Sequence, residues 1–117
     1  MRRSASAIGA VALLLYLAPL HAQETVLAEF GSTMRYLANS EDPGIYMSWP
    51  NPAFDVSGWS TGQYGIGYDT TNAAEDLLLT TVAPGTKSIY TRTTFTIDDV
   101  NDVENLVFGA DYDDAYV

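Results

Sequence analysis

The chain has 117 residues, with five lysines and arginines against fifteen aspartates and glutamates, giving a net charge of −10 at pH 7. Such an acidic chain repels nucleic acid phosphates and anionic lipid head groups, so we expect neither nucleic acid nor a membrane surface as a partner. It has no cysteine and one histidine, His21, which excludes disulfide bonds, catalytic cysteines and cysteine-liganded zinc.

The first 22 residues are typical of a Sec-type signal peptide. Arg2 and Arg3 precede an apolar run over residues 7–20, and the small residue Ala22 follows it. The run is too short to cross a bilayer of about 30 Å as a helix, so a membrane anchor is the weaker alternative. We therefore predict a signal-peptide helix over residues 1–22, a secreted chain, and one small domain over residues 23–117.

Cleavage after Ala22 would remove the only histidine, which excludes Ser-His-Asp and Cys-His catalysis from the remaining chain. The acid pairs Asp98–Asp99 and Asp113–Asp114 are the remaining candidates for chemistry. Adjacent residues of a strand point to opposite faces, whereas glycoside hydrolysis needs two carboxylates across a cleft. We interpret these pairs as solvated turn residues and predict that the chain is not an enzyme.

The first half of the mature chain reads as strands joined by turns. A first strand is expected over residues 25–30, a break at Gly31, and a second strand that includes residues 34–37. Residues 39–44 (NSEDPG) predict a surface turn. Residues 46–59 hold two prolines, which cannot donate to a strand ladder. Trp49, Phe54 and Trp59 in the same segment are large enough to pin it, so we expect a long loop held onto a sheet.

Residues 62–68 (GQYGIGY) have the wrong glycine order for a phosphate-binding loop, and we interpret them as bulges or a bend in a strand. Residues 71–79 have helical character, with Thr71 or Asn72 as a cap, and a short helix or none is equally expected. Pro84 and Gly85 then predict a turn.

The last thirty residues alternate apolar and polar side chains, which is typical of strands with one buried face. In residues 88–97 we expect one face to be buried and the other, which carries Arg92, to point outward. Residues 98–104 predict a charged turn, and residues 106–112 another strand. Phe95, Ile97, Leu106 and Phe108 should therefore turn inward.

Six short blocks resemble the galactose-binding-like jelly rolls of secreted bacterial multidomain proteins and of β-galactosidase-type glycoside hydrolases. They are GSTMRYL at 31–37, the region of Trp49 and Pro52, FDVSGW at 54–59, GIGYD at 65–69, SIYTRTTFTIDD at 88–99 and YDDAYV at 112–117. The resemblance implies an all-β fold, a jelly-roll-like antiparallel β-sandwich.

The sequence departs from this family in three places. Met34 replaces a frequent tryptophan, Ala115 replaces a glycine, and the Asn-Gly hairpin with its following strands is absent. We therefore expect an incomplete sandwich whose final two to four strands are missing, so the partners would include those strands or other domains of a parent protein.

A carbohydrate-binding surface would need aromatic rings that stack on sugars and polar groups that bind hydroxyls. The candidate ligand-binding residues are Trp49, Trp59, Tyr64, Tyr68, Asp69 and Arg92. For the tryptophans the alternative is a place in the core, and for Arg92 it is an exposed ion pair.

The acidic run near the end of the chain raises the question of calcium, which prefers oxygen ligands. Asp111, Asp113 and Asp114 are candidate metal ligands for a structural calcium ion. A solvated turn is the favoured alternative, and no other cofactor is expected.

These features predict a secreted, non-catalytic carbohydrate-binding-like or attachment module, a fragment of a larger protein, with a glycan or cell-surface polysaccharide as partner. Two alternatives remain: an ancillary domain of a secreted glycoside hydrolase or other hydrolase, and a structural or adhesive spacer without a small ligand.

Overall fold

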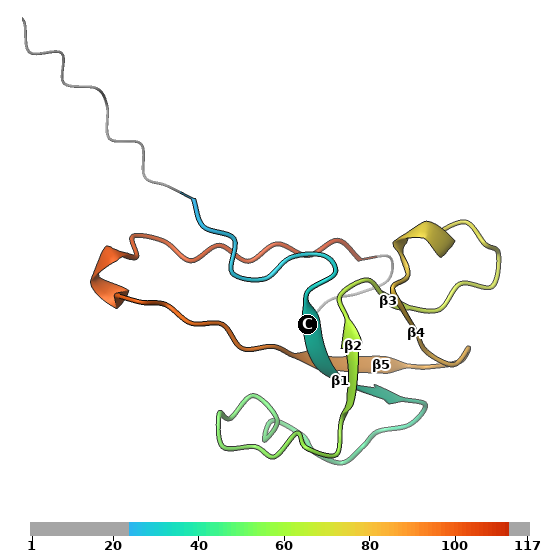
Figure 1. The fold of residues 1–117 in the computed structure, drawn as a ribbon. Coiled ribbons are helices and arrows are strands. Elements are labelled where there is room, and N and C mark those ends of the chain that lie inside the picture. The colour runs from blue at the N-terminus through green and yellow to red at the C-terminus, as the bar shows by residue number, and fades with distance from the viewer. Residues whose placement is uncertain (1–23, 113–117) are drawn as a thin grey trace, which may run out of the picture.

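The computed structural model describes residues 24–112 as an all-β chain, whose helical geometry is limited to two short 3₁₀ turns. The longest strand, β1 (Thr33–Asn39), lies at the centre of an antiparallel sheet. The strands β2 (Ser60–Gln63) and β5 (Ser88–Arg92) flank it, giving the order β2-β1-β5 (Figure 1).

A second, smaller sheet consists of β3 (Ile66–Gly67) and β4 (Thr80–Thr81), which are parallel. The chain between them forms a crossover that includes the 3₁₀ turn η1 (Glu75–Leu77), as a parallel pair requires. The Thr80 hydroxyl joins the two sheets, because it accepts from the backbone N–H of Gln63 at 2.8 Å and donates to the carbonyl of Gln63 at 2.9 Å.

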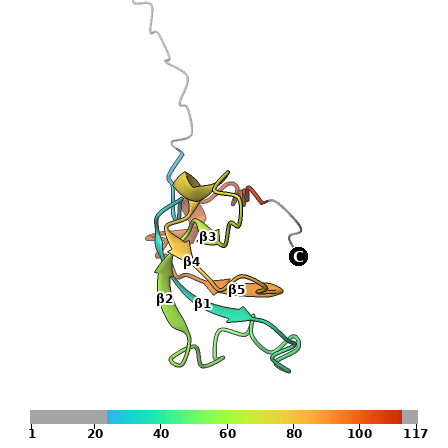
Figure 2. The same cartoon turned by 90° about the vertical axis from the view of Figure 1, so that its right-hand side faces the viewer.

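The three-stranded sheet has different neighbours on its two sides. The loop over residues 40–59 lies on one side, and β3, β4 and η1 lie toward the other (Figures 1 and 2). In the register of β1 and β5, Leu37 is opposite Tyr90 and Asn39 is opposite Ser88, so these four residues share the face toward the loop. Ala38 and Ile89 share the opposite face.

The buried core of the described residues is small and consists of Met34, Trp59 and Val82 with the polar Asn39. The Asn39 side-chain amide donates to the Leu37 carbonyl at 3.3 Å and to the Ser88 hydroxyl at 3.2 Å. The backbone carbonyl of Asn39 accepts separately from the backbone N–H of Lys87 at 2.7 Å. The side-chain bonds offset the cost of burying an amide side chain.

Turn predictions are confirmed where glycine or proline carried them. Gly31, before β1, has φ of +86°. Gly44 has φ of +69° and donates its N–H to the Asp42 carboxylate at 2.8 Å, which closes the predicted 39–44 turn. Gly65, between β2 and β3, has φ of +102°, so the glycines of residues 62–68 mark a bend.

Before β4 one prediction is wrong, and the question of a helix over residues 71–79, which the sequence left open, is decided. Residues 25–30 form no strand and end in a turn, in which the Ser32 N–H donates to the Glu29 carbonyl at 2.9 Å. The helical character of residues 71–79 is limited to η1, because no backbone bond outside that turn continues a helix. The side chain that accepts backbone N–H groups at the start of this segment is that of Asp69, and neither Thr71 nor Asn72 acts as the predicted cap.

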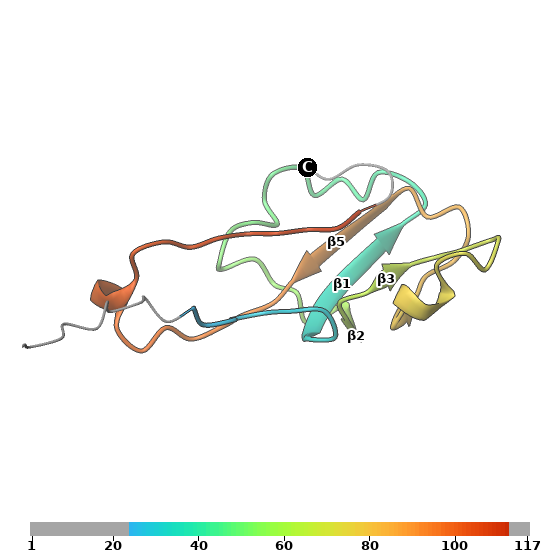
Figure 3. The ribbon, with the colours of Figure 1, turned by 90° about the horizontal axis from the view of Figure 1, so that it is seen from above.

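The terminal stretch also differs from prediction. The strand begins at Ser88 as expected but ends at Arg92, and the predicted charged turn contains the 3₁₀ turn η2 (Val100–Asp102). Residues 106–112 form no strand (Figure 3). Phe95, Leu106 and Phe108 are exposed, and Ile97 is half-buried. The predicted inward alternation is therefore wrong beyond Arg92. The predicted signal peptide over residues 1–22 lies outside the described residues.

Candidate functional site

An aromatic cluster forms where the 46–59 loop lies against the sheet. The Trp49 ring stacks on Tyr90 with centroids 5.1 Å apart and planes 5° from parallel. Trp59 contacts Tyr90 at 6.4 Å and meets Phe54 edge-on at 6.1 Å. Such pairs contribute about 0.5–1.5 kcal/mol each beyond their buried area. The cluster (Trp49, Phe54, Trp59, Tyr90) therefore fixes the loop on β5.

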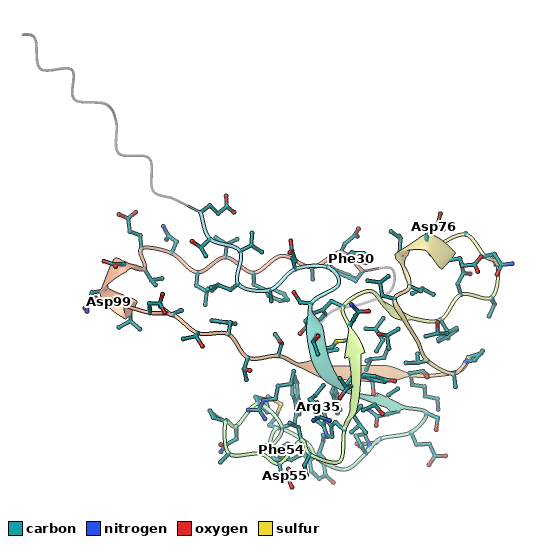
Figure 4. All side chains as sticks on the ribbon, in the orientation of Figure 1. Phe30, Arg35, Phe54, Asp55, Asp76 and Asp99 are labelled. Atoms are coloured by element: carbon teal, nitrogen blue, oxygen red, sulfur yellow. The ribbon has the colours of Figure 1, made fainter. Side chains whose placement is uncertain are left out.

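Two arginines hold the backbone of the same loop. The Arg92 guanidinium donates to the carbonyls of Asn51 at 2.8 Å, Phe54 at 3.2 Å and Trp49 at 3.5 Å. Arg35, opposite Arg92 in the register, donates to the Trp59 carbonyl at 3.2 Å. The predicted outward face of β5 is therefore covered by the loop, which corrects the reading of Arg92 as an exposed residue. Figure 4 shows Arg35 and Phe54 on this side of the sheet.

Short turns within the loop leave these carbonyls available. Asn51 accepts the Ala53 N–H at 2.9 Å through its side chain, and Asp55 accepts the Ser57 N–H at 2.8 Å. The second bond lowers the pKa of the Asp55 carboxyl below its ordinary value, because the N–H stabilises the charged form. Pro50 and Pro52 lack an N–H and therefore disfavour a strand in this segment, which leaves its backbone carbonyls to accept from the arginines.

A shallow groove of about 490 Å³ lies beside the aromatic cluster, between the 40–47 turn and the start of β5. Tyr90 contributes to both the cluster and the groove. The groove combines carboxylates, a lysine and aromatic rings; its lining residues are Glu41, Asp42, Pro43, Tyr46, Met47, Lys87, Ser88 and Tyr90.

Tyr46 is the most unusual residue of this groove. It has φ of +45°, in the left-handed region that bulky residues avoid, and its side chain is 80% exposed. Neighbouring Met47 is also exposed. Strained backbone of this kind costs about 1–3 kcal/mol and is concentrated at binding sites. The groove therefore presents an aromatic ring to solvent next to Glu41 and Asp42.

The predicted ligand-binding residues fall into two separate groups: Trp49, Trp59 and Arg92 lie together at the loop, and the others lie near β3. Trp59 is buried, Trp49 is half-buried against Tyr90, and Arg92 is bonded to the loop. Tyr64 and Tyr68 lie next to β3, toward the opposite side of the sheet. A role for any of them in ligand binding stays a prediction.

Asp69 closes the turn that follows β3. Its carboxylate accepts the N–H of Thr71 at 2.7 Å and the N–H of Ala74 at 2.6 Å. These bonds, with that of Ala74 the larger cause, lower the pKa of Asp69 below its ordinary 3.8. The lone pairs of its oxygens are thus partly used within the protein.

The candidate metal ligands are only partly in view. Asp111 is exposed, whereas Asp113 and Asp114 lie outside the described residues. Over residues 24–112 no group of three or more acids or histidines is arranged to hold an ion. Within the same residues, no helix has the length and apolar character needed to cross a bilayer.

The groove residues Glu41, Tyr46, Met47 and Lys87 were missed by sequence reasoning. The 39–44 turn was predicted, so its acids were expected at the surface, but no pattern indicated that Lys87, more than forty positions later, would lie beside it. The pairing of Asn39 with Ser88 produces that proximity.

Comparison with protein-family models, with curated proteins and with solved structures found no match to this chain.

Proposed function

We propose that this chain is a secreted, non-catalytic module that binds a glycan or a cell-surface polysaccharide through the groove between the 40–47 turn and β5. The observation that carries the proposal is Tyr46, an exposed ring at positive φ beside Glu41 and Asp42. An aromatic face can stack on a sugar ring, while carboxylate oxygens and the Lys87 ammonium can bind its hydroxyls. Secretion is supported by the basic and apolar leader of residues 1–22.

The incomplete jelly-roll-like sandwich belongs to the same proposal. It is supported by the antiparallel order β2-β1-β5 and by the loop that crosses one face of this sheet. The parallel pair β3–β4 departs from the predicted antiparallel arrangement. In a jelly-roll-like sandwich the loops at the sheet ends supply the binding surface and the sheet supplies rigidity. The Arg92 bonds and the aromatic cluster give the 46–59 loop that rigidity.

The experiment is a screen of the chain against neutral and acidic glycans, followed by calorimetry on any glycan that binds. We expect Tyr46→Ala to weaken binding about tenfold, which corresponds to about 1.4 kcal/mol, because it removes the ring on which a sugar would stack. Tyr68→Ala is the matched control, because Tyr68 is also exposed but lies next to β3. If Tyr68→Ala abolishes binding and Tyr46→Ala does not, the groove is the wrong site.

A structural or adhesive spacer is the second candidate. The packing of both tryptophans favours it, because neither ring is presented as a flat exposed platform. Silence across the whole glycan screen, with the chain folded by circular dichroism, would favour the spacer over the binding module.

A further inference from the structure

A long extended segment follows β5 and differs from the rest of the chain. Residues 94–112, here called the acidic arm, run away from the sheet, turn at η2 and return as a second extended stretch (Figures 1 and 3). Among residues 24–112, the stretches 94–98 and 104–107 make no backbone hydrogen bond. Extended backbone of this kind presents donors and acceptors that another strand can pair with.

The side chains of the arm are those of a covered strand. Phe95 is 46% exposed, Leu106 65% and Val107 87%. Leu106 and Val107 are adjacent, so an extended backbone directs them to opposite faces, and the returning stretch is apolar on both. Strands with two apolar faces are typical of the inside of a sheet and not of a solvated edge.

All charged side chains of the arm are acidic, and this determines which kind of strand can pair with it. Residues 94–112 contain no lysine, arginine or histidine, and their five carboxylates are those of Asp98, Asp99, Asp102, Glu104 and Asp111. A second copy of this chain would bring the same five charges against them, and like charges across a strand pair are destabilising. A basic strand would instead be attracted.

We propose that the acidic arm binds, by strand addition, an extended segment of a partner protein in which apolar residues alternate with lysines or arginines. The backbone of the arm supplies the hydrogen bonds, and Phe95, Leu106 and Val107 supply the apolar contact. The carboxylates around η2 select the basic residues. This surface is separate from the groove of Tyr46 and does not depend on glycan binding.

The test measures binding of the labelled peptide KVKVRVKV to the whole chain by fluorescence anisotropy, with EVEVEVEV as the acidic comparison. We expect the basic peptide alone to bind, more weakly as salt rises, and to slow amide hydrogen exchange in residues 94–98 and 104–107. Val107→Pro removes one N–H from the arm and should raise the dissociation constant about tenfold. Val26→Pro is the matched control, because Val26 is also exposed and its N–H makes no hydrogen bond within the described residues.

Binding of the basic peptide that Val107→Pro weakens and Val26→Pro does not would support the proposal. Absence of binding, equal binding of EVEVEVEV, or equal binding by Val107→Pro would overturn it. Slowed exchange confined to residues 88–92 would also overturn it, since the peptide would then occupy the edge of β5. Sedimentation showing that the chain dimerises through the arm without peptide would assign the surface to a second copy. Tyr46→Ala should leave peptide binding unchanged.

Discussion

Arg92 shows how one side chain can organise a loop that has no regular structure. A guanidinium carries five N–H donors in a rigid fork, and here it donates to the carbonyls of Trp49, Asn51 and Phe54. The period of two in the sequence predicted that Arg92 and Tyr90 lie on the same face of their strand, and the register confirms it. It could not show that this face is covered, because coverage depends on a loop forty residues earlier.

Replacing Arg92 by lysine should therefore loosen the loop. A lysine ammonium cannot match the planar fork, so we expect Arg92→Lys to lower the free energy of unfolding by about 2 kcal/mol, the scale of one or two charge-assisted hydrogen bonds. Arg35→Lys, which affects the single bond to the Trp59 carbonyl, is the control and should cost about half as much. Urea unfolding followed by tryptophan fluorescence measures both; equal costs would contradict the account of Arg92.

The turn after β3 should depend on pH. The folded state holds the pKa of Asp69 below its ordinary value through the N–H groups of Ala74 and Thr71. A group with a depressed folded pKa contributes stability above its unfolded pKa and loses it as pH falls through the folded pKa. Residues 69–77 should therefore loosen as pH falls below about 4.

The carboxyl carbon shift of Asp69, followed by NMR during acid titration, measures this pKa directly. We expect a titration midpoint below 3.8 for the native chain. In Asp69→Ala the turn should already be less ordered than in the native chain at pH 7, because the N–H groups of Ala74 and Thr71 have lost their acceptor. Asp76→Ala is the control, because the Asp76 carboxylate lies in the same 3₁₀ turn and caps nothing there. A midpoint at or above 3.8 would show that these bonds are absent in solution.

At the scale of elements, the sequence predicted turns better than strands. Pro43 with Gly44, and Pro84 with Gly85, mark turns through their own backbone preferences, which need no distant partner. A strand forms only where a second strand pairs with it. The strand predicted over residues 88–97 is confirmed up to Arg92, where pairing with β1 ends at Arg35, but both of its faces are half-buried and not one alone. Beyond that point the described residues offer no partner strand, so Phe95 is exposed.

The bend between β2 and β3 depends on a glycine that no other residue can replace. Gly65 has φ of +102°, and a Cβ at this position would lie 2.6 Å from the Phe30 ring and 2.7 Å from the Leu77 carbonyl oxygen. We expect Gly65→Ala to cost at least about 1–3 kcal/mol, since the backbone strain alone is of that size. Gly58→Ala is the control, because its Cβ would meet nothing within 4 Å. Thermal unfolding compares them; equal melting temperatures would contradict this bend.

At the scale of the whole molecule, an all-β chain was predicted from the strand periodicity and from the resemblance to jelly rolls, and the all-β character is confirmed. The candidate site was not predicted as a unit. Tyr46 and Glu41 lie near Lys87 because β1 pairs with β5 in a particular register, and that register cannot be read from a single sequence. The predicted aromatic residues were found mostly in packing roles. Burial of Trp59 with Met34 supplies a core that a chain without disulfides requires.

We infer that the β1–β5 pairing and the loop held by Arg92 form the rigid part of the molecule, whereas the stretches 94–98 and 104–107 are extended and make no backbone hydrogen bond within the described residues. Residue-resolved amide hydrogen exchange tests it most directly. Backbone amides of β1 and β5 should exchange slowly, and those of residues 94–98 and 104–107 near the rate of an unstructured peptide. Equal protection in the two regions would contradict the account, because it would mean that the arm is paired within the free chain.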